Sequence, residues 1–198
     1  MNPAGLSRIA FGIQYVGTNY AGWQSQLHQN TVQDSLESAI SSFLGKEHQE
    51  KVRVVVAGRT DSGVHALGQV VHFDTSVDRD IFSWVRGINA FLPKDISVHW
   101  AKFVPPEFDA RFSAQERAYT YVLAASSHPL PLLNDQAGYV LVPSDRWLDV
   151  RRCKMQPIIC LELMTLVHFD LQSVRVRLLL RRFINLRLLI TNRMYISL

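Results

Sequence analysis

The residue whose surroundings most suggest chemistry is Asp61, in the segment AGRTDSG that begins at Ala57. Runs of β-branched residues flank this segment, so the pattern predicts a strand, a loop and a second strand. Gly58 and Gly63 are expected to take positive φ on either side of Asp61, so that the loop presents the carboxylate in a fixed direction. Arg59 lies two residues away, and a neighbouring positive charge favours the ionised carboxylate. Such an Asp can act as a nucleophile or as a general base.

Two other interpretations of this segment stay open. Asp followed by Ser-Gly is common in turns, where the Asp side chain bonds to its own backbone. Asp61, His65 and Asp74 could also form a metal site, although nothing in their spacing fixes a ligand geometry. On the local pattern alone, an ordinary turn is favoured over a catalytic loop, and the metal site is disfavoured.

Aromatic and basic residues elsewhere could bind a nucleic acid. Trp23 and Gln24 follow two glycines in a loop, where they could stack on and hydrogen-bond to unpaired bases, or belong to a packed surface loop. Tyr119 begins an alternating segment, and its ring could stack on a base or pack in the core or an interface. Arg111 could meet a phosphate or be an ordinary surface charge.

Hydrophobic periodicity predicts the elements that position these residues. Thr31 and Asp80 are expected to cap two helices, and alternating segments predict strands. The order strand, helix, strand, strand, helix, strand is that of a ferredoxin-like α+β fold, in which both helices cover one face of an antiparallel sheet and the other face is left for substrate. The predicted strands are 8–16, 52–56, 69–74, 96–103, one from Tyr119 and 138–141; the predicted helices are 32–44, 80–92 and one after Ser144.

Three segments together carry a resemblance to a known family. The words GRTDSGVHALGQVVHF closely resemble the active-site motif of the tRNA pseudouridine synthase A family. The segment from Tyr15 to Gln24 resembles the family's Y-x-G-x-x-Y-x-G-W-Q, and ARFSA with R-x-Y-x-Y resembles a further family motif. The resemblance covers residues 8–150 and implies the N-terminal catalytic domain of such an enzyme.

The resemblance implies roles for individual residues. Asp61 would be catalytic with Arg59 beside it, and Tyr119 would pack against the target base. It also raises the RNA-contact interpretation of Trp23 and Gln24. The expected substrate is tRNA at uridines 38, 39 and 40 of the anticodon arm, bound by a homodimer. Because the product is an isomer of the substrate, no cofactor or metal is expected, and the sequence has no P-loop or dinucleotide-binding glycine pattern.

Composition separates the chain into two parts. Residues 1–150 carry 12 Lys and Arg against 15 Asp and Glu, whereas residues 151–198 carry 9 against 2. The net charge of +4 therefore comes from the tail and does not by itself indicate nucleic-acid binding. The first residues lack the apolar stretch of a signal peptide. The sequence also contains no run of about 18 apolar residues, the length that a membrane-spanning helix needs. A cytoplasmic protein is therefore expected.

The tail, residues 151–198, departs from the family pattern and is expected to fold poorly. A basic amphipathic segment of this kind could bind RNA or a membrane surface. Another interpretation is a reading frame shifted by one base near Val150. With suitable synonymous codons, the neighbouring frame over Val150 to Arg175 can spell EKMQNAAHYLLGTHDFSSFRSAECQ, which contains the G-x-H-D-F-x-x-F-R segment of the family. The alternative to an enzyme is then a catalytically defective truncated relative that at most binds RNA.

Overall fold

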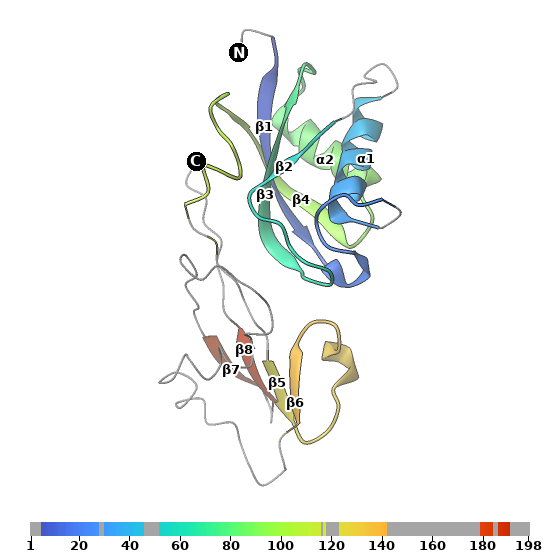
Figure 1. Ribbon diagram of the computed structural model, residues 1–198, viewed down its shortest axis with the longest axis vertical. Coiled ribbons are helices and arrows are strands. Elements are labelled where there is room, and N and C mark those ends of the chain that lie inside the picture. The colour runs from blue at the N-terminus through green and yellow to red at the C-terminus, as the bar shows by residue number, and fades with distance from the viewer. Residues whose placement is uncertain are drawn as a thin grey trace. The chain divides into compact units, whose positions relative to one another are not determined.

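The computed structural model describes residues 5–27, 30–45, 52–115, 117, 123–141, 179–183 and 186–190. The chain divides into two compact units, one of residues 1–115 and one of residues 116–195, and both are drawn in Figure 1. The domain boundary predicted at residue 150 lies outside the described residues. In the part of the chain that the structure describes, no helix combines the length and the apolar character needed to cross a membrane.

The first unit has the predicted ferredoxin-like α+β architecture. Its sheet has the strand order β2-β3-β1-β4, and every neighbouring pair is antiparallel. Both helices lie on one side of this sheet (Figure 1). The elements are β1 (Ser7–Tyr15), α1 (Val32–Leu44), β2 (Val55–Val56), β3 (Ala66–Thr75), α2 (Ile81–Phe91) and β4 (Ile96–Val104).

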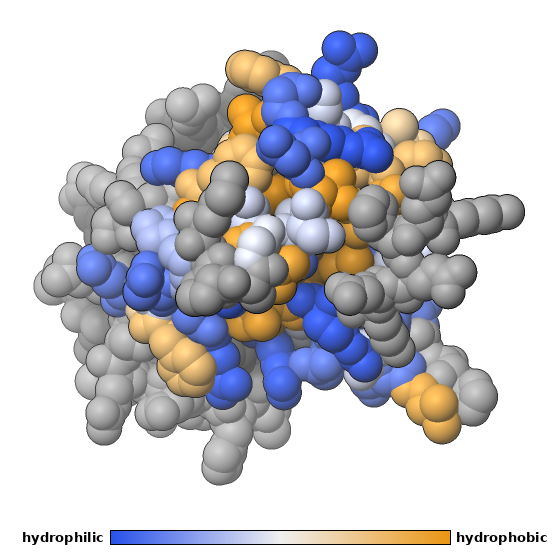
Figure 2. Space-filling view, turned by 90° about the horizontal axis from the view of Figure 1, so that it is seen from above, coloured by the Kyte–Doolittle hydropathy of each residue, from blue (hydrophilic) through white to orange (hydrophobic). Residues whose placement is uncertain are grey.

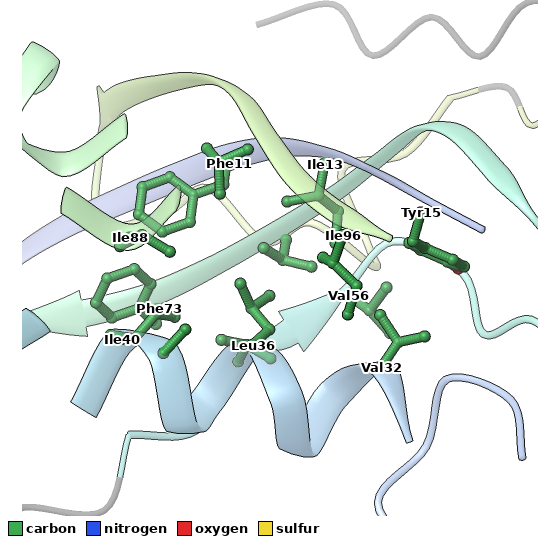
Figure 3. Packing of buried hydrophobic residues seen from close by; sticks show 14 of the residues in the cluster. Phe11, Ile13, Tyr15, Val32, Leu36, Ile40, Val56, Phe73, Ile88 and Ile96 are labelled. Carbon is green, nitrogen blue, oxygen red and sulfur yellow. The ribbon is translucent and has the colours of Figure 1, made fainter. Parts of the chain in front are cut away.

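Alternation along β1 determines which side chains enter the core. Ile9, Phe11 and Ile13 are fully buried toward the helices, because every second residue of a strand faces the same side. In the register of the sheet, Phe11 lies opposite Val71 and Ile9 lies opposite Phe73. Figure 3 shows Phe11, Ile13 and Phe73 of the sheet on the side of the sheet that faces Leu36 and Ile40 of α1. Burying each such side chain stabilises the fold by about 1.5–3 kcal/mol.

Both helices begin at the predicted capping residues. The side chain of Thr31 accepts a hydrogen bond from the backbone N–H of Asp34 (3.2 Å). The side chain of Asp80 accepts one from the backbone N–H of Ser83 (2.9 Å). Each cap satisfies an N–H group that has no partner inside the helix.

The face of the sheet away from the helices is partly covered. Residues 105–114, here called the strap, follow β4 and lie on this side in Figure 1. Phe108, Ala110 and Ala114 of the strap pack with Ala57 and Val70. The expectation that this whole face is left for substrate is therefore corrected, because the strap covers part of it. Figure 2 views the molecule from above, along its long axis, and shows hydrophobic residues near the middle with hydrophilic and further hydrophobic residues around them.

The second unit contains a separate four-stranded sheet of order β6-β5-β8-β7. β5 pairs in parallel with β6, while β8 is antiparallel to both β5 and β7. The strand predicted at 138–141 is confirmed as β6; the helix predicted after Ser144 lies outside the described residues. The out-of-frame origin of the tail stays a prediction, although the structure assigns two strands there. The elements are β5 (Leu123–Ser126), β6 (Gly138–Leu141), β7 (Leu179–Phe183) and β8 (Leu186–Ile190).

Candidate active site

The loop that carries Asp61 spans residues 57–65 and joins β2 to β3. Tyr15, at the end of β1, lies opposite Ala66, the first residue of β3, so the loop leaves the sheet at this end. Its start is tied to β3 twice. The N–H of Ala57 donates to the carbonyl of Val70 (2.9 Å), and Gln69 Nε2 donates to the carbonyl of Gly58 (2.6 Å). These two hydrogen bonds fix the start of the loop relative to β3.

Asp61 itself is exposed at the start of a tight turn. The N–H of Val64 donates to the carbonyl of Asp61 (3.2 Å), and Gly63 takes the positive φ that was predicted (+78°). Gly58 is not among the described glycines with positive φ, which corrects that part of the prediction. Within the described residues the Asp61 carboxylate makes neither a hydrogen bond nor an ion pair, so the turn uses its backbone and leaves its side chain toward solvent.

Arg59 is also exposed. Among the described side chains, Arg59 and Asp61 form no ion pair, and the ion pairs present join Arg8 to Asp74 and Arg53 to Glu37. The expected charge pairing between Arg59 and Asp61 is thus not made in this structure. An exposed guanidinium instead suits contact with an anionic ligand such as a phosphate.

A second loop, residues 17–24, is hydrogen-bonded to the Asp61 loop and is here called the clamp loop. The N–H of Trp23 donates to the carbonyl of Thr60 (2.9 Å), next to Asp61. The carbonyl of Tyr20 accepts from the N–H of Gly63 (3.3 Å) and from the hydroxyl of Ser62 (3.1 Å). Backbone groups on both sides of Asp61 are therefore bonded to the clamp loop.

Two glycines allow the clamp loop to lie this close. A Cβ at Gly17 would lie 2.1 Å from the carbonyl oxygen of Val64, and one at Gly22 would lie 2.8 Å from that of Thr60. Gly22 also has a φ of +97°, which other residues rarely adopt. The glycines of this motif thus serve close backbone approach to the Asp61 loop.

The structure corrects the RNA-contact prediction for Trp23. Its side chain is only 1% exposed and packs near Tyr15, with ring centroids 6.0 Å apart. The side chain of Trp23 therefore belongs to the core, and the alternative of a packed loop describes this residue better. The alternation of apolar residues could not reveal this, because the residue lies outside any strand or helix.

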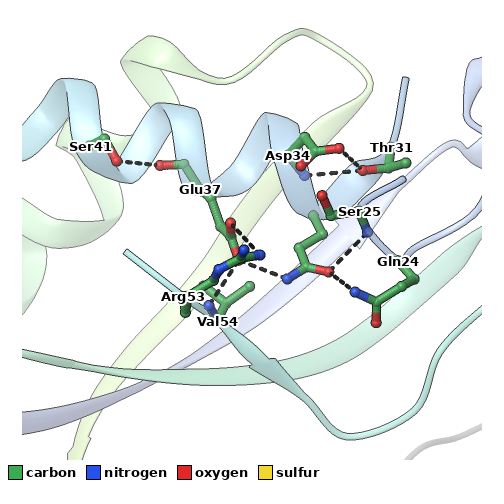
Figure 4. A network of polar contacts seen from close by, with 9 residues as sticks. Gln24, Ser25, Thr31, Asp34, Glu37, Ser41, Arg53 and Val54 are labelled. Carbon is green, nitrogen blue, oxygen red and sulfur yellow. Dashed lines mark hydrogen bonds and ion pairs between the residues drawn. The ribbon is translucent and has the colours of Figure 1, made fainter. Parts of the chain in front are cut away.

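Gln24 is also engaged within the protein. Its Nε2 donates to Gln33 Oε1 (2.9 Å), and Gln33 Nε2 donates to Glu37 Oε1 (2.7 Å). The same carboxylate oxygen of Glu37 accepts from the N–H of Val54 (3.1 Å), just before β2. Figure 4 shows this network beside α1. Gln24 thus connects the clamp loop to the helix, which leaves its amide oxygen as the group for any RNA contact.

Two tyrosines that sequence reasoning did not single out support the site. The hydroxyl of Tyr15 is hydrogen-bonded to Thr60 Oγ1 (2.8 Å), and burial raises the pKa of Tyr15. The hydroxyl of Tyr20 donates to Asp95 Oδ1 (2.7 Å); burial, followed by this bond, raises the pKa of Tyr20 to about 12. Their position in the family-like motif was the available signal.

The remaining predicted residues lie on other segments. Arg111 is exposed on the strap, and its guanidinium lies over the ring of Phe112 at 5.5 Å. Tyr119 lies outside the described residues. The structure therefore brings Asp61, Arg59 and the clamp loop together, and it places Arg111 on a separate segment of the same unit.

Two of the three residues considered as metal ligands, His65 and Asp74, have other contacts. His65 Nδ1 accepts from the N–H of Gly17 (2.9 Å), and Asp74 is bonded to Arg8. Among the described residues no group of three or more His, Cys, Asp or Glu side chains is arranged to hold a metal ion.

Comparison with known proteins gives a consistent result. A family model described as tRNA pseudouridine synthase matches residues 12–113, which include the clamp loop, the Asp61 loop and most of the strap. A tRNA pseudouridine synthase A from Polynucleobacter asymbioticus is 60% identical over 148 residues, 74% of this chain and 54% of the relative. One from Cupriavidus pinatubonensis is 53% identical over 145 residues, 73% of this chain and 52% of the relative. The chain thus spans about half the length of the curated relatives it matches.

Proposed function

The chain belongs to the tRNA pseudouridine synthase family, and we propose that it isomerises uridine to pseudouridine in tRNA with Asp61 as the catalytic carboxylate. In this reaction the bond from ribose C1′ to uracil N1 breaks, the base turns, and a bond from C1′ to C5 forms. The proton on C5 is lost and N1 gains one, so substrate and product have the same atoms. Neither an oxidant nor a reductant is needed.

The observation that carries this proposal is the exposed Asp61 side chain on a firmly held loop. Clamp-loop bonds to Thr60, Ser62 and Gly63 hold the backbone on both sides. Because the backbone is held in this way, the loop needs little further ordering before the Asp61 carboxylate reaches a reacting atom. Asp61 would then act as nucleophile or as general base on a uridine that has left its stack.

We further propose which residues contact the tRNA, which uridines are modified, and in which oligomeric state and compartment the protein acts. Arg59 and Arg111 would bind tRNA phosphates, Gln24 would contribute through its amide oxygen, and Tyr119 would pack against the target base. The resemblance supports uridines 38, 39 and 40 of the anticodon arm as targets, a homodimer, and action in the cytoplasm. Recognition of neighbouring positions by one enzyme favours contacts to phosphates and shape over contacts to base edges.

The test follows the hydrogen on C5. Transfer RNA labelled with tritium at uridine C5 should release tritium to water as the new bond forms. Asp61→Asn should reduce this release by at least about a thousandfold, while tRNA binding is retained. Asp78→Asn is the matched control, because Asp78 is also an exposed carboxylate but lies in the loop before α2. Full activity of the Asp61→Asn protein would refute the role of Asp61.

A second candidate is an RNA-binding protein without turnover. The observation that favours it is that the chain spans about half the length of the relatives it matches. Binding of tRNA without tritium release, even when protein exceeds tRNA, would support this candidate. Release of several equivalents of tritium per protein would rule it out.

A further inference from the structure

The strap is held on the sheet by Arg8 of β1. One guanidinium nitrogen, Nη1, donates to the carbonyls of Pro106 (2.6 Å) and Phe108 (2.7 Å). The other two nitrogens donate to the carboxylate of Asp74 at 2.7 and 2.8 Å. Arg8 therefore fixes the first half of the strap; among the described residues it makes no hydrogen bond to residues 109–114.

His72 holds the second half. It lies on β3, on the face away from the helices, and is 3% exposed. Its Nδ1 accepts a hydrogen bond from the N–H of Ala110 (3.0 Å). The ring of Phe108 packs edge-on against the imidazole, with centroids 5.8 Å apart. A nitrogen that accepts a hydrogen bond must be unprotonated, so this contact requires one particular state of His72.

The contact lies next to Arg111. Asp109 Oδ1 accepts from the N–H groups of Arg111 (2.8 Å) and Phe112 (2.9 Å), which closes a turn around Ala110. Ala110 is fully buried and packs with Ala57, the first residue of the Asp61 loop. The turn that carries Arg111 is thus fixed internally by Asp109 and placed relative to the Asp61 loop through Ala110.

We propose that His72 is a positioning residue for tRNA binding, which holds Ala110 through Nδ1 so that Arg111 meets a tRNA phosphate at a set place relative to Asp61. This inference rests on the proposed function, because it names tRNA as the ligand. His72 is buried and does not touch the substrate; its effect passes through the turn of residues 109–112.

Two substitutions of His72 separate positioning from packing. The side-chain oxygen of Asn can occupy the place of Nδ1, whereas the longer Gln places its polar atoms near the position of Nε2. Both are polar amides, so their burial costs are similar. His72→Asn should retain tRNA affinity, and His72→Gln should weaken it about five- to tenfold, as expected for loss of one hydrogen bond.

The effect of His72 should pass through Arg111. Arg111→Gln should weaken binding and reduce the slope of log affinity against log salt concentration by about one. His72→Gln should reduce this slope in the same way, and the double variant should be no weaker than Arg111→Gln alone. Additive losses, or equal losses in His72→Asn and His72→Gln, would overturn the proposal, as would unchanged binding in both.

Thr75→Val is the matched control. Thr75 is also a buried polar residue of β3, and its hydroxyl oxygen accepts from the N–H of Val77 (3.1 Å), away from the strap. Thr75→Val should lower stability without changing the salt slope.

Amide hydrogen exchange gives a readout that does not need tRNA: residues 109–112 should exchange faster in His72→Gln than in His72→Asn. If the wild-type chain binds no tRNA, the proposed function fails with this role of His72; if tRNA binds and His72→Gln does not weaken it, only the role of His72 fails.

Discussion

The hydroxyls of Tyr15 and Thr60 are hydrogen-bonded at 2.8 Å, although 45 residues separate them in the chain. Thr60 directly precedes Asp61, so the end of the central strand β1 supports the backbone from which the carboxylate projects. The ring of Tyr15 is buried against Trp23 of the clamp loop. One side chain of the core therefore touches both loops of the candidate active site.

Tyr15→Phe removes this hydroxyl and keeps the ring. We expect the free energy of unfolding to fall by about 0.5–1.5 kcal/mol and tritium release to slow, because the Asp61 loop loses a support. Thr60→Val removes the other partner, and the two losses should be non-additive in a double-mutant cycle measured by denaturant unfolding. Additive losses would show that the two hydroxyls act independently.

Gly22→Ala tests whether the clamp loop positions Asp61. The new Cβ would lie 2.8 Å from the carbonyl oxygen of Thr60, at a φ of +97°. Strain at such a φ costs about 1 kcal/mol or more, and the backbone clash should also displace the Asp61 loop. Both the free energy of unfolding and the turnover number should therefore fall.

Gly45→Ala is the control for this strain. Gly45 has a φ of +89° at the end of α1, and a Cβ there would meet nothing within 4 Å. It should lower stability to a similar degree without changing turnover at temperatures where the protein is folded. Equal losses of turnover in both variants would mean that the clamp loop does not position Asp61.

The elements of the first unit could be predicted from the sequence, whereas these contacts between loops could not. The periodicity of β1, α1 and α2 and the capping residues Thr31 and Asp80 are local signals, so the ferredoxin-like unit could be predicted from them. The bonds from Tyr20 and Trp23 to the Asp61 loop join segments about 40 residues apart, and no local pattern encodes them. The resemblance favoured RNA contact for Trp23, and no local pattern opposed it, since an aromatic residue in a glycine-rich loop has no periodicity to show that it is buried.

The strap was missed for a related reason. Arg8 lies in a strand pattern, and its bonds to Pro106 and Phe108 span about a hundred residues. His72 similarly sits in a run of apolar residues that predicted only a strand. The motif ARFSA was recognised, but its place on the sheet depends on these two long-range contacts.

Protonation of His72 should make stability depend on pH. Burial lowers the pKa of His72 from 6.5, and the nearby charge of Arg8 acts in the same direction, whereas Asp109 and Asp74 act against it. Because the folded pKa lies below the unfolded one, the unfolded chain binds more protons between them. The stabilisation is therefore present above the unfolded pKa and is lost as the pH falls toward the folded pKa.

The measurement is the free energy of unfolding between about pH 7.5 and 5 for the wild type and for His72→Asn. The variant should show a weaker fall. Asp74 does not interfere, because its bond to Arg8 lowers its pKa from 3.8 and its stabilisation is lost only as the pH falls below that value. Parallel curves for the two proteins would contradict the assignment.

Sequencing the coding DNA across the codons for Trp147 to Leu198 tests whether the tail is read in a shifted frame. In the one-base-shifted frame each codon joins the third base of one present codon to the first two bases of the next. Its last two bases are therefore mostly fixed by the residues present, so a 25-residue fit to the family pattern is improbable by chance. We expect the neighbouring frame to encode HDFSSFR where residues 163–170 now stand and to continue into a further half-domain. The protein read from that frame should then release tritium from labelled tRNA faster than the present chain. If the codons cannot encode that segment, the tail is genuine, and the RNA-binding candidate without turnover becomes the better account of this chain.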